Sequence, residues 1–310
     1  MPKFKVDKKR LEKLLRRNNI PISDAVKRGK FYEDFYDWDG LSKDYADNKY
    51  SILDICKKLN LSYDTVRVNL IRKLGKLHEF RRLSSYTFRE DLLYPMSNIG
   101  AYFMGWLYSD GYMVESTMFG ITLSAKDTEQ LSYLAGLVSD KSVTVKNNKV
   151  TFNFYSVELA KKLQKDFKVF PNKSHKNFTI PLELYNNCLP YLLLGLLEGD
   201  GSISKSSCCS LLLTSNTWNV IREAIKGFVD LSSMYERPLN DYGLLNVIFS
   251  GKSYFSLLQY IYCNTPEIKP LKRKYERFTN QLQKSMNGRT SPYKKLAVNV
   301  WDSLNNTRKC

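Results

Sequence analysis

The sequence predicts an α+β protein built from two copies of one αββαββα unit, with a helical module ahead of them. Two apolar segments with the same pattern, 101–111 and 191–201, carry this prediction, and similar strand-like and helix-like segments follow each one. Each segment contains an internal glycine and ends in Asp-Gly, and the matching positions are 90 residues apart (195 − 105, 200 − 110, 201 − 111). A repeat that keeps register over the length of a domain indicates two copies of one structural unit.

Residues 1–90 form a basic N-terminal region, and within it residues 51–75 have the pattern of a helix-turn-helix. Apolar residues recur at helical spacing on both sides of a short turn at 60–62, and Ser62 is a good N-cap for the second helix. In this motif the second helix enters the DNA major groove, although an ordinary helical hairpin that binds nothing has the same pattern. The side chains expected to contact DNA are Tyr63, Asp64, Arg67, Asn69 and Lys73.

The first repeat unit, 97–170, and the second, 189–285, are expected to form the same elements after the apolar helix: two strands, a helix, two strands and a helix. In the first unit these segments are 112–114, 119–125, 128–138, 142–145, 150–155 and 157–167. In the second unit they are 202–204, 210–215, 218–229, 233–237, 244–250 and 254–262. A linker, 171–188, joins the units, and 286–310 are expected to form a polar tail whose apolar cluster packs on a domain.

The composition points to a polyanion as the partner. Within 310 residues, 48 Lys and Arg stand against 31 Asp and Glu, which gives a formal net charge of +17. Such a charge is typical of proteins that bind nucleic acid, although a well-solvated surface also accounts for it. We expect no membrane partner, because no apolar run is long enough to span a bilayer and the N-terminus lacks the apolar core of a signal peptide. The six cysteines show no CxxC pair, so we expect reduced thiols in an intracellular compartment, either the cytoplasm of a bacterial or phage-infected cell or an organelle.

The two apolar helices are expected to be buried and to pack against each other. Small residues four positions apart lie on one face of each helix and allow the two backbones to approach closely. These residues are Gly105 and Ser109 in the first helix and Gly195 and Gly199 in the second. Asp110 and Asp200 then meet where both helices end, and the partial negative charge of helix C-termini makes that position costly for two carboxylates. A hard divalent cation such as Mg²⁺ resolves the conflict, unless Asp-Gly only marks a tight turn after a core helix.

Segments 103–111 and 193–201 resemble the two signature helices of the LAGLIDADG homing endonucleases, in the single-chain form with two motifs. The resemblance covers roughly residues 98–283. The first copy departs from the pattern at Met104, Trp106 and Tyr108, and Tyr108 replaces the usual acid of the sixth motif position. The resemblance implies two units packed through paired helices, a four-stranded antiparallel saddle in each unit, and metal-binding acids at Asp110 and Asp200.

The resemblance also implies an activity. A monomer of this family hydrolyses both strands of a long, asymmetric double-stranded DNA site, leaves short 3′ extensions, and so promotes the mobility of an intron or a gene. The implied cofactor is Mg²⁺, with Mn²⁺ as a substitute and Ca²⁺ supporting binding without cleavage. A lysine near the cleavage centre of each half, which would stabilise charge on the phosphate or hold the attacking water, is expected at Lys173 or its rival Lys176, and at Lys274 or its rival Lys272. Each of these lysines could equally be a plain contact to the DNA backbone.

Side chains on one face of each saddle are expected to read bases in the major groove, because successive side chains of a strand point to opposite faces. The candidates are Thr122, Ser124, Lys146, Thr151, Asn153, Lys205, Thr214, Arg237 and Asn246. Two alternatives stay open. One is a non-catalytic DNA-binding transcriptional regulator of the same fold, for which lost acids are expected. The other is a maturase that binds its own intron RNA.

Overall fold

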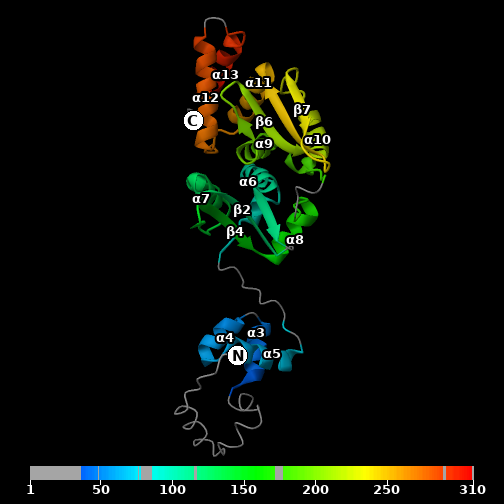
Figure 1. Ribbon diagram of the computed structural model, residues 1–310, viewed down its shortest axis with the longest axis vertical. Helices are drawn as coiled ribbons and strands as arrows, with labels where there is room; N and C mark the ends of the chain where they lie inside the picture. The colour runs from blue at the N-terminus through cyan, green and yellow to red at the C-terminus, as the bar shows by residue number, and fades with distance from the viewer. Residues whose placement is uncertain are drawn as a thin grey trace, which may run out of the picture. The chain divides into compact units, whose positions relative to one another are not determined.

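The computed structural model describes residues 36–47, 49–75, 77, 86–114, 117–171, 177–288 and 291–308. The chain divides into two compact units, Met1–Leu83 and Ser84–Cys310, and each is described below on its own (Figure 1). Lys173 and Lys176, the lysines expected near the cleavage centre of the first half, lie outside the described residues.

The described part of the first unit is a set of three helices around one apolar core. They are α3 (Trp38–Ala46), α4 (Ile52–Leu59) and α5 (Tyr63–Leu74). Asn60, in the left-handed region with φ 54°, ends α4, and the Ser62 hydroxyl accepts a hydrogen bond from the N–H of Thr65 in the first turn of α5. The core includes Trp38, Ile55, Val66 and Leu70. Two short helices joined by a tight turn therefore occur where the apolar spacing predicts them.

The second unit contains two αββαββα repeats, which confirms the predicted fold class. The first repeat consists of α6 (Asn98–Ser109), β1 (Gly111–Val114), β2 (Met118–Ser124), α7 (Thr128–Val138), β3 (Thr144–Lys146), β4 (Lys149–Tyr155) and α8 (Val157–Asp166). The second consists of α9 (Leu189–Glu198), β5 (Ser202–Ile203), β6 (Cys208–Thr214), α10 (Ser215–Ile225), β7 (Met234–Pro238), β8 (Leu244–Ser250) and α11 (Gly251–Cys263). Short 3-10 helices occur at η1 (Glu90–Leu92), η2 (Ala125–Asp127) and η4 (Leu182–Tyr185).

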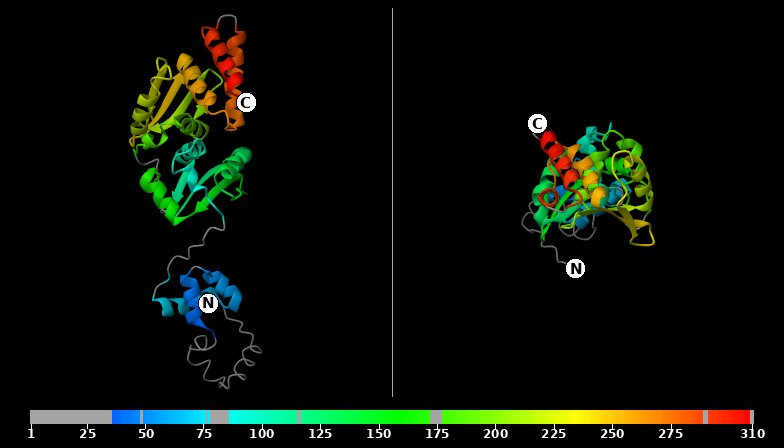
Figure 2. Two further views of the ribbon diagram at one scale, coloured as in Figure 1. Left: turned by 180° about the vertical axis from the view of Figure 1, so that it is seen from behind. Right: turned by 90° about the horizontal axis from the view of Figure 1, so that it is seen from above.

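Each repeat forms one antiparallel four-stranded sheet, ordered β1-β2-β4-β3 in the first and β5-β6-β8-β7 in the second. Side chains alternate along the long strands, so one face of each sheet is buried in the shared core. The opposite face, called the outer face below, carries side chains that are partly or fully exposed, except at Gly120 and Thr214, which are buried. Helices α6 and α9 lie side by side between the two sheets (Figures 1 and 2). Because β1 and β5 begin just after these helices, the C-terminal ends of α6 and α9 lie where the first strands of the two sheets begin.

The C-terminal segment, expected as a polar tail whose apolar cluster packs on a domain, does pack on the second repeat and is helical. It forms a helical hairpin of α12 (Lys272–Asn287) and α13 (Lys294–Thr307), and α13 packs on both α11 and α12 (Figure 2). Ala297, Val300 and Leu304 of α13 are all buried. Their spacing of three and four residues places them on one face of a helix, so the segment folds by burying that stripe.

All five cysteines within the described residues are free thiols, and burial raises the pKa of the Cys188 thiol to about 11. Such a thiol is inert as a nucleophile near neutral pH. Over the part of the chain that the structure describes, no helix has both the length and the apolar character needed to cross a bilayer.

Candidate active site at the paired helices

Helices α6 and α9 touch backbone to backbone at a pair of glycines. A Cβ atom added to Gly105 would lie 2.8 Å from the Cα of Gly195 and 2.9 Å from the N of Leu196. A Cβ added to Gly195 meets the Cα of Gly105 at the same 2.8 Å. Real Cβ atoms do not approach backbone this closely, so only glycine fits at these two positions. The helix contact therefore depends on the absence of two side chains.

The same close approach continues to the C-terminal ends of the two helices. A Cβ added to Gly199 would lie 2.6 Å from the Cβ of Ser109. The Ser109 hydroxyl turns back and donates to the carbonyl oxygen of Gly105 at 3.0 Å, which keeps this side chain compact. The small residues predicted from the sequence, Gly105, Ser109, Gly195 and Gly199, thus all lie in the contact between α6 and α9.

The two acids of the repeats lie at this shared helix end. Asp110 follows α6 directly, and its Oδ2 atom lies 3.3 Å from the position of a Cβ on Gly199, the residue before Asp200. Asp110 is half-buried and Asp200 is exposed. Both carboxylates also raise the pKa of one and the same ammonium group, that of Lys274. The structure therefore brings the acid of each repeat to one place, 90 residues apart in the chain (200 − 110).

Lys274 of α12 is buried beneath this helix end. Its Nζ atom donates to four backbone carbonyl oxygens, those of Leu197 (2.7 Å), Glu198 (2.7 Å), Gly199 (2.9 Å) and Gly201 (2.6 Å). The side chain is only 2% exposed, and burial, followed by the charge of Arg273, lowers the pKa of Lys274 to about 8. The ammonium thus satisfies carbonyls that α9 leaves without helical partners and offsets the negative end of the helix dipole.

The surroundings of Lys274 fit a positioning role for this predicted catalytic lysine. Its ammonium holds the turn that contains Asp200 in place through hydrogen bonds to the backbone carbonyls of that turn. Its rival Lys272 is different, because its side chain is 82% exposed and lies 3.9 Å from Glu276. Contact of either lysine with a phosphate stays a prediction.

Two αββαββα repeats meet at apolar helices whose glycines touch, and each helix ends in an Asp-Gly pair on a four-stranded sheet. The chain has the LAGLIDADG fold. No protein-family profile and no curated protein sequence matches it significantly.

The solved structures similar to this fold include two meganucleases bound to DNA and the LAGLIDADG domain of DUF199/WhiA. The LAGLIDADG meganuclease I-AabMI bound to uncleaved DNA shares 13% identity over 68% of this chain and 99% of that one, with a TM-score of 0.40. The meganuclease I-SmaMI bound to uncleaveable DNA shares 12% identity over 69% and 100%, with a TM-score of 0.37. The N-terminal LAGLIDADG domain of DUF199/WhiA shares 16% identity over 53% and 82%, with a TM-score of 0.35.

The sixth position of each LAGLIDADG helix ties that helix to the segment that follows its own repeat. In the second helix this residue is Glu198, which is fully buried and accepts hydrogen bonds from the Leu271 N–H (2.6 Å) and the Tyr102 hydroxyl (2.5 Å). Burial raises the pKa of Glu198 to about 7, although both hydrogen bonds oppose the shift. Gln130 extends the network, since its Nε2 donates to the Tyr102 hydroxyl at 2.7 Å.

In the first helix a phenol occupies the equivalent position. The Tyr108 hydroxyl donates to the carbonyl oxygen of Phe167 at 2.5 Å, just after α8, and lies 3.1 Å from the Tyr185 hydroxyl. Glu198 therefore accepts a hydrogen bond from the segment that follows its repeat, whereas Tyr108 donates one to the equivalent segment. Sequence reasoning missed Glu198 and its partners, yet an acid inside an otherwise apolar helix is a signal that a buried partner exists.

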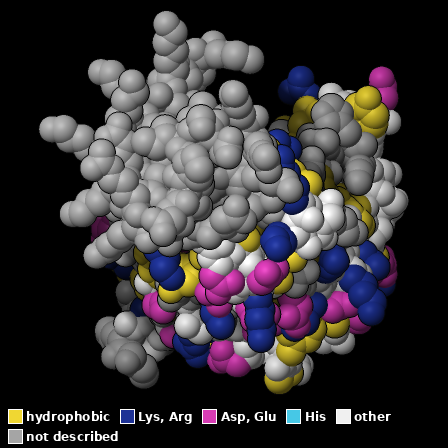
Figure 3. Space-filling view, turned by 90° about the horizontal axis from the view of Figure 1, so that it is seen from below, with side chains coloured by type: hydrophobic (Ala, Val, Ile, Leu, Met, Phe, Trp, Pro, Cys, Tyr) yellow, Lys and Arg dark blue, Asp and Glu magenta, His cyan; other side chains and the backbone are white. Residues whose placement is uncertain are grey.

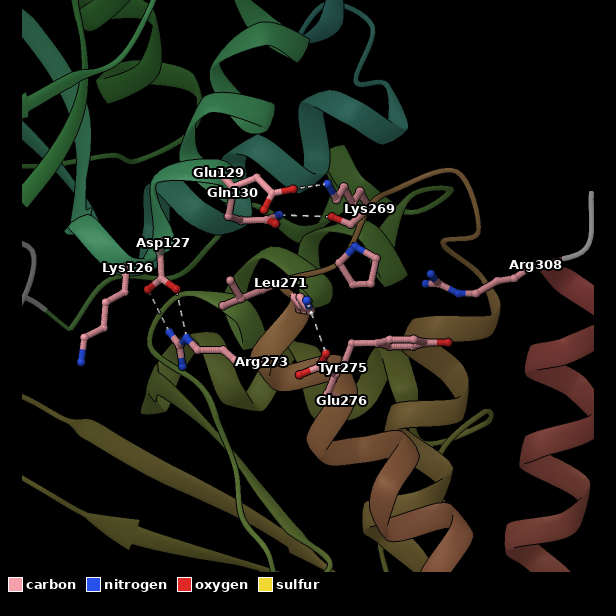
Figure 4. Close-up of a pocket in the computed structure, with 12 residues that line it drawn as sticks. Lys126, Asp127, Glu129, Gln130, Lys269, Leu271, Arg273, Tyr275, Glu276 and Arg308 are labelled. Atoms are coloured by element: carbon pink, nitrogen blue, oxygen red, sulfur yellow. Dashed lines mark hydrogen bonds and ion pairs between the residues drawn. The ribbon is translucent and has the colours of Figure 1, made fainter.

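A set of polar contacts joins the two repeats beside this network (Figure 4). Arg273 at the start of α12 pairs with both carboxylate oxygens of Asp127 at 3.1 and 3.3 Å, and Lys269 pairs with Glu129. The Gln130 Nε2 also donates to the Lys269 carbonyl at 3.2 Å. These residues line a cavity of about 560 Å³. These contacts hold the segment before α12 against the first repeat. They thereby help to place Lys274, the residue after Arg273, at the site.

All five base-reading candidates of the first repeat lie on the outer face of its sheet. They are Thr122, Ser124, Lys146, Thr151 and Asn153. One of them is oriented by a neighbour: the Nζ of Lys141 donates to Oδ1 of Asn153 at 2.7 Å and to its carbonyl at 2.6 Å. The Asn153 side chain also has a hydrogen-bond interaction with the Tyr112 hydroxyl, across Gly120, so both ends of its amide have a protein partner.

Three of the four candidates in the second repeat have a suitable position. Arg237 and Asn246 lie next to each other on the outer face, and Lys205 is exposed between β5 and β6. Thr214 differs from the expectation, because it is only 6% exposed and its hydroxyl donates to the Phe178 carbonyl. Its side chain also accepts from the Thr217 N–H as the N-cap of α10, so capping determines this threonine.

Four of the five side chains expected to contact DNA from α5 are exposed. They are Tyr63, Asp64, Arg67 and Lys73. Lys73 lies 3.0 Å from Asp39 of α3. Asn69 is buried instead, and its Nδ2 donates to the Thr65 carbonyl at 2.9 Å, so it faces the core of the first unit and not a groove.

Charge on the described surface is mixed in the view of Figure 3, where Lys and Arg side chains alternate with Asp and Glu side chains. The net positive charge is therefore not collected into one patch on that face. For metal binding, no group of three or more His, Cys, Asp or Glu side chains within the described ranges could hold an ion. The donor set at the helix end consists of the Asp110 and Asp200 carboxylates with backbone carbonyls, which are the oxygen ligands that suit Mg²⁺.

Proposed function

We propose that the protein is a Mg²⁺-dependent, site-specific DNA endonuclease that cuts both strands of a long asymmetric site and so promotes the mobility of an intron or a gene. The observation that carries this proposal is the convergence of Asp110 and Asp200 at the ends of the paired helices. The LAGLIDADG resemblance of both motifs supports it, because the acids that hold metal in the family fall on these two residues. Helix ends and carboxylates concentrate negative charge here, which favours a divalent cation.

The residues of the site would divide the work in the following way. Asp110 and Asp200 would hold Mg²⁺ with one carboxylate from each repeat, and the ion's other oxygen ligands would come from DNA phosphate and water. When bound, Mg²⁺ supplies Lewis-acid stabilisation of the phosphate and lowers the pKa of a bound water. Lys274 holds the Asp200 turn in place through four carbonyls and lowers the negative potential at the site. Mn²⁺ would substitute for Mg²⁺, and Ca²⁺ would support binding alone.

The outer faces of the two sheets are proposed to lie on double-stranded DNA. The first carries hydroxyl, amide and ammonium groups, and the formal net charge of +17 favours a polyanion. Both repeats belong to one chain and their outer faces differ, so we propose that a monomer binds an asymmetric target. The free thiols fit a reducing intracellular compartment.

The strongest alternative is DNA or intron-RNA binding without cleavage, as a regulator or a maturase. One observation favours it: the buried ammonium of Lys274 already offsets part of the charge of Asp110 and Asp200 without a metal. Cleavage therefore has to be measured separately from binding.

The test is selection followed by cleavage. Duplexes bound by the full chain in Ca²⁺ would be selected from a random library, cloned into a supercoiled plasmid, and incubated with Mg²⁺ or with EDTA. Linear plasmid at one selected site, formed with Mg²⁺ and not with EDTA, is the expected result. Tight sequence-specific binding that never yields linear plasmid would replace the proposal with the regulator or the maturase. An absence of any selected DNA sequence would contradict DNA cleavage altogether.

A further inference from the structure

The two outer faces can be compared position by position, because the strand registers match. In the first sheet Thr122, Thr151 and Thr144 form one row across β2, β4 and β3. The corresponding row of the second sheet is Leu212, Asn246 and Arg237 across β6, β8 and β7. Thr122 and Leu212 are also 90 residues apart, as the two motifs are (212 − 122). The same strand registers match the neighbouring rows of the first sheet with those of the second.

The second sheet is apolar at several positions where the first sheet is polar. Ile248 takes the place of Asn153, because Ser210 pairs with Ile248 as Gly120 pairs with Asn153. Leu244 takes the place of Lys149, since Thr214 pairs with Leu244 as Ser124 pairs with Lys149. Leu239, next to Leu244, takes the place of Lys146, next to Lys149. Tyr235 lies beside Ile248 at the edge of the sheet. The residues of this apolar band are Leu212, Tyr235, Leu239, Leu244 and Ile248.

These side chains are partly or fully open to solvent, as a reading surface requires. Tyr235 is 55% exposed and Leu239 46% exposed, and the other three are half-buried. A small cavity of about 90 Å³ lies at one end of the band, lined by Leu212, Leu244, Phe178 and Asp200, among others. Exposed apolar side chains on a strand face usually mark a contact surface.

Double-stranded DNA is the occupant that the position of this band favours. Asp200 precedes β5 by two residues and lines the same cavity as Leu212, so DNA held at the two acids crosses this face. Arg237 and Asn246 stand in the same row as Leu212 and supply a cation and an amide for a groove. In the major groove, thymine differs from the other bases by its C5-methyl group, and apolar side chains recognise that methyl.

We propose that the second repeat reads its half-site largely through thymine methyl groups, whereas the central part of the first sheet reads by hydrogen bonds. The proposal rests on the proposed function, since it needs DNA on the outer faces. At the edge where β1 pairs with β2, and β5 with β6, the first sheet is instead the more apolar of the two. Val114 and Met118 of the first sheet stand where the second has Ser204 and Cys208, on the basis of the same 90-residue offset (204 − 114, 208 − 118). Methyl contacts of the first half are therefore confined to that edge.

The test replaces thymine by uracil, which removes only the C5-methyl group. With a site selected as above, each thymine of each half would be replaced in turn and the Kd of the full chain measured in Ca²⁺. We expect binding about fourfold weaker for each contacted methyl lost in the second half, and little change in the centre of the first half.

A matched pair of variants links the effect to the band. Leu212→Ser and Ile248→Asn replace two apolar side chains of the band by polar ones that carry no methyl group, and the double variant should lose the uracil sensitivity of the second half. Thr122→Ser, in the first sheet, is the control and should keep it. A thermal melt of each variant separates misfolding from lost recognition, and the uracil series on the wild-type chain needs no variant.

Three results would overturn the proposal. One is tight binding with no uracil effect in the second half. Another is an equal uracil effect in the centre of both halves. The third is a dimer in sedimentation that Tyr235→Ser dissolves, which would make the band an interface between copies of this chain. Selection of no DNA sequence at all would instead contradict the proposed function itself.

Discussion

The substitution Gly105→Ala tests the close contact of the two LAGLIDADG helices. The added Cβ would lie 2.8 Å from the Cα of Gly195 and 2.9 Å from the N of Leu196, and both are backbone atoms that cannot swing away. Helices α6 and α9 must therefore separate by several tenths of an ångström. The movement loosens the packing of the fully buried residues that line both helices.

The expected cost follows from two opposing effects. Overpacking a well-packed core costs about 1–3 kcal/mol, whereas replacing glycine by alanine within a helix gains up to about 1 kcal/mol. The free energy of unfolding should therefore fall by about 0–2 kcal/mol, which lowers the Tm of a unit of this size by about 0–8 °C.

Gly136→Ala is the matched control. Gly136 lies in α7, is exposed, and has no atom within 4 Å of the added Cβ. The same substitution should there raise the Tm by about 2–4 °C, because only the helix propensity changes. Thermal unfolding followed by circular dichroism compares the two variants. If Gly105→Ala raises the Tm as Gly136→Ala does, the two helices do not meet at this glycine and the reasoning is refuted.

Three further predictions concern the groups around the site. Lys274→Met leaves four carbonyls without their ammonium partner and should lower the free energy of unfolding in urea by about 3–5 kcal/mol. The exposed control Lys272→Met should change it by less than about 1 kcal/mol. Equal effects of the two variants would contradict the burial of the Lys274 ammonium among these carbonyls. Because burial raises the pKa of Glu198 from 4.5 to about 7, the folded state keeps a proton that the unfolded state loses, so this contribution is complete below pH 4.5 and is lost as the pH rises through 7. Glu198→Gln should therefore remove a loss of stability of about 3 kcal/mol between these pH values, and an unchanged pH profile would show that Glu198 titrates normally. Lys141→Met frees the Oδ1 of Asn153 and should relax base preference at one position by about 1–3 kcal/mol in a binding selection, without changing preferences in the other half; an unchanged preference would show that Lys141 does not orient Asn153.

The elements that the sequence predicted well are those whose signal is local. Hydrophobic alternation located the strands, and helical spacing with a serine cap located α5. The glycines of the two motifs predicted the helix contact, because small residues four apart have few other uses in a buried helix. The convergence of Asp110 and Asp200 followed from the same repeat.

Features that depend on tertiary neighbours could not be predicted in this way. No local pattern encodes the position of Lys274 beneath the end of α9, because it requires the path of the chain through α11 and α12; only the family resemblance indicated a lysine there. Thr214 and Asn69 have side chains suited to DNA, yet capping and core packing determine them. The packing of residues 286–310 on a domain was expected, but not the helix α13, because polar residues dominate its composition although its buried residues have helical spacing.

The central claim is that the two acids act together in one site. It is tested most directly with a plasmid that carries the selected target, incubated in Mg²⁺ with wild type, Asp110→Asn, Asp200→Asn and the control Asp302→Asn, which changes an exposed acid of α13. We expect linear plasmid with wild type and with the control. We expect none with either motif variant, although both should bind the target in Ca²⁺ with nearly unchanged Kd. Linearisation at the wild-type rate by either motif variant would contradict a shared site, and so would specific binding by wild type that never leads to a cut.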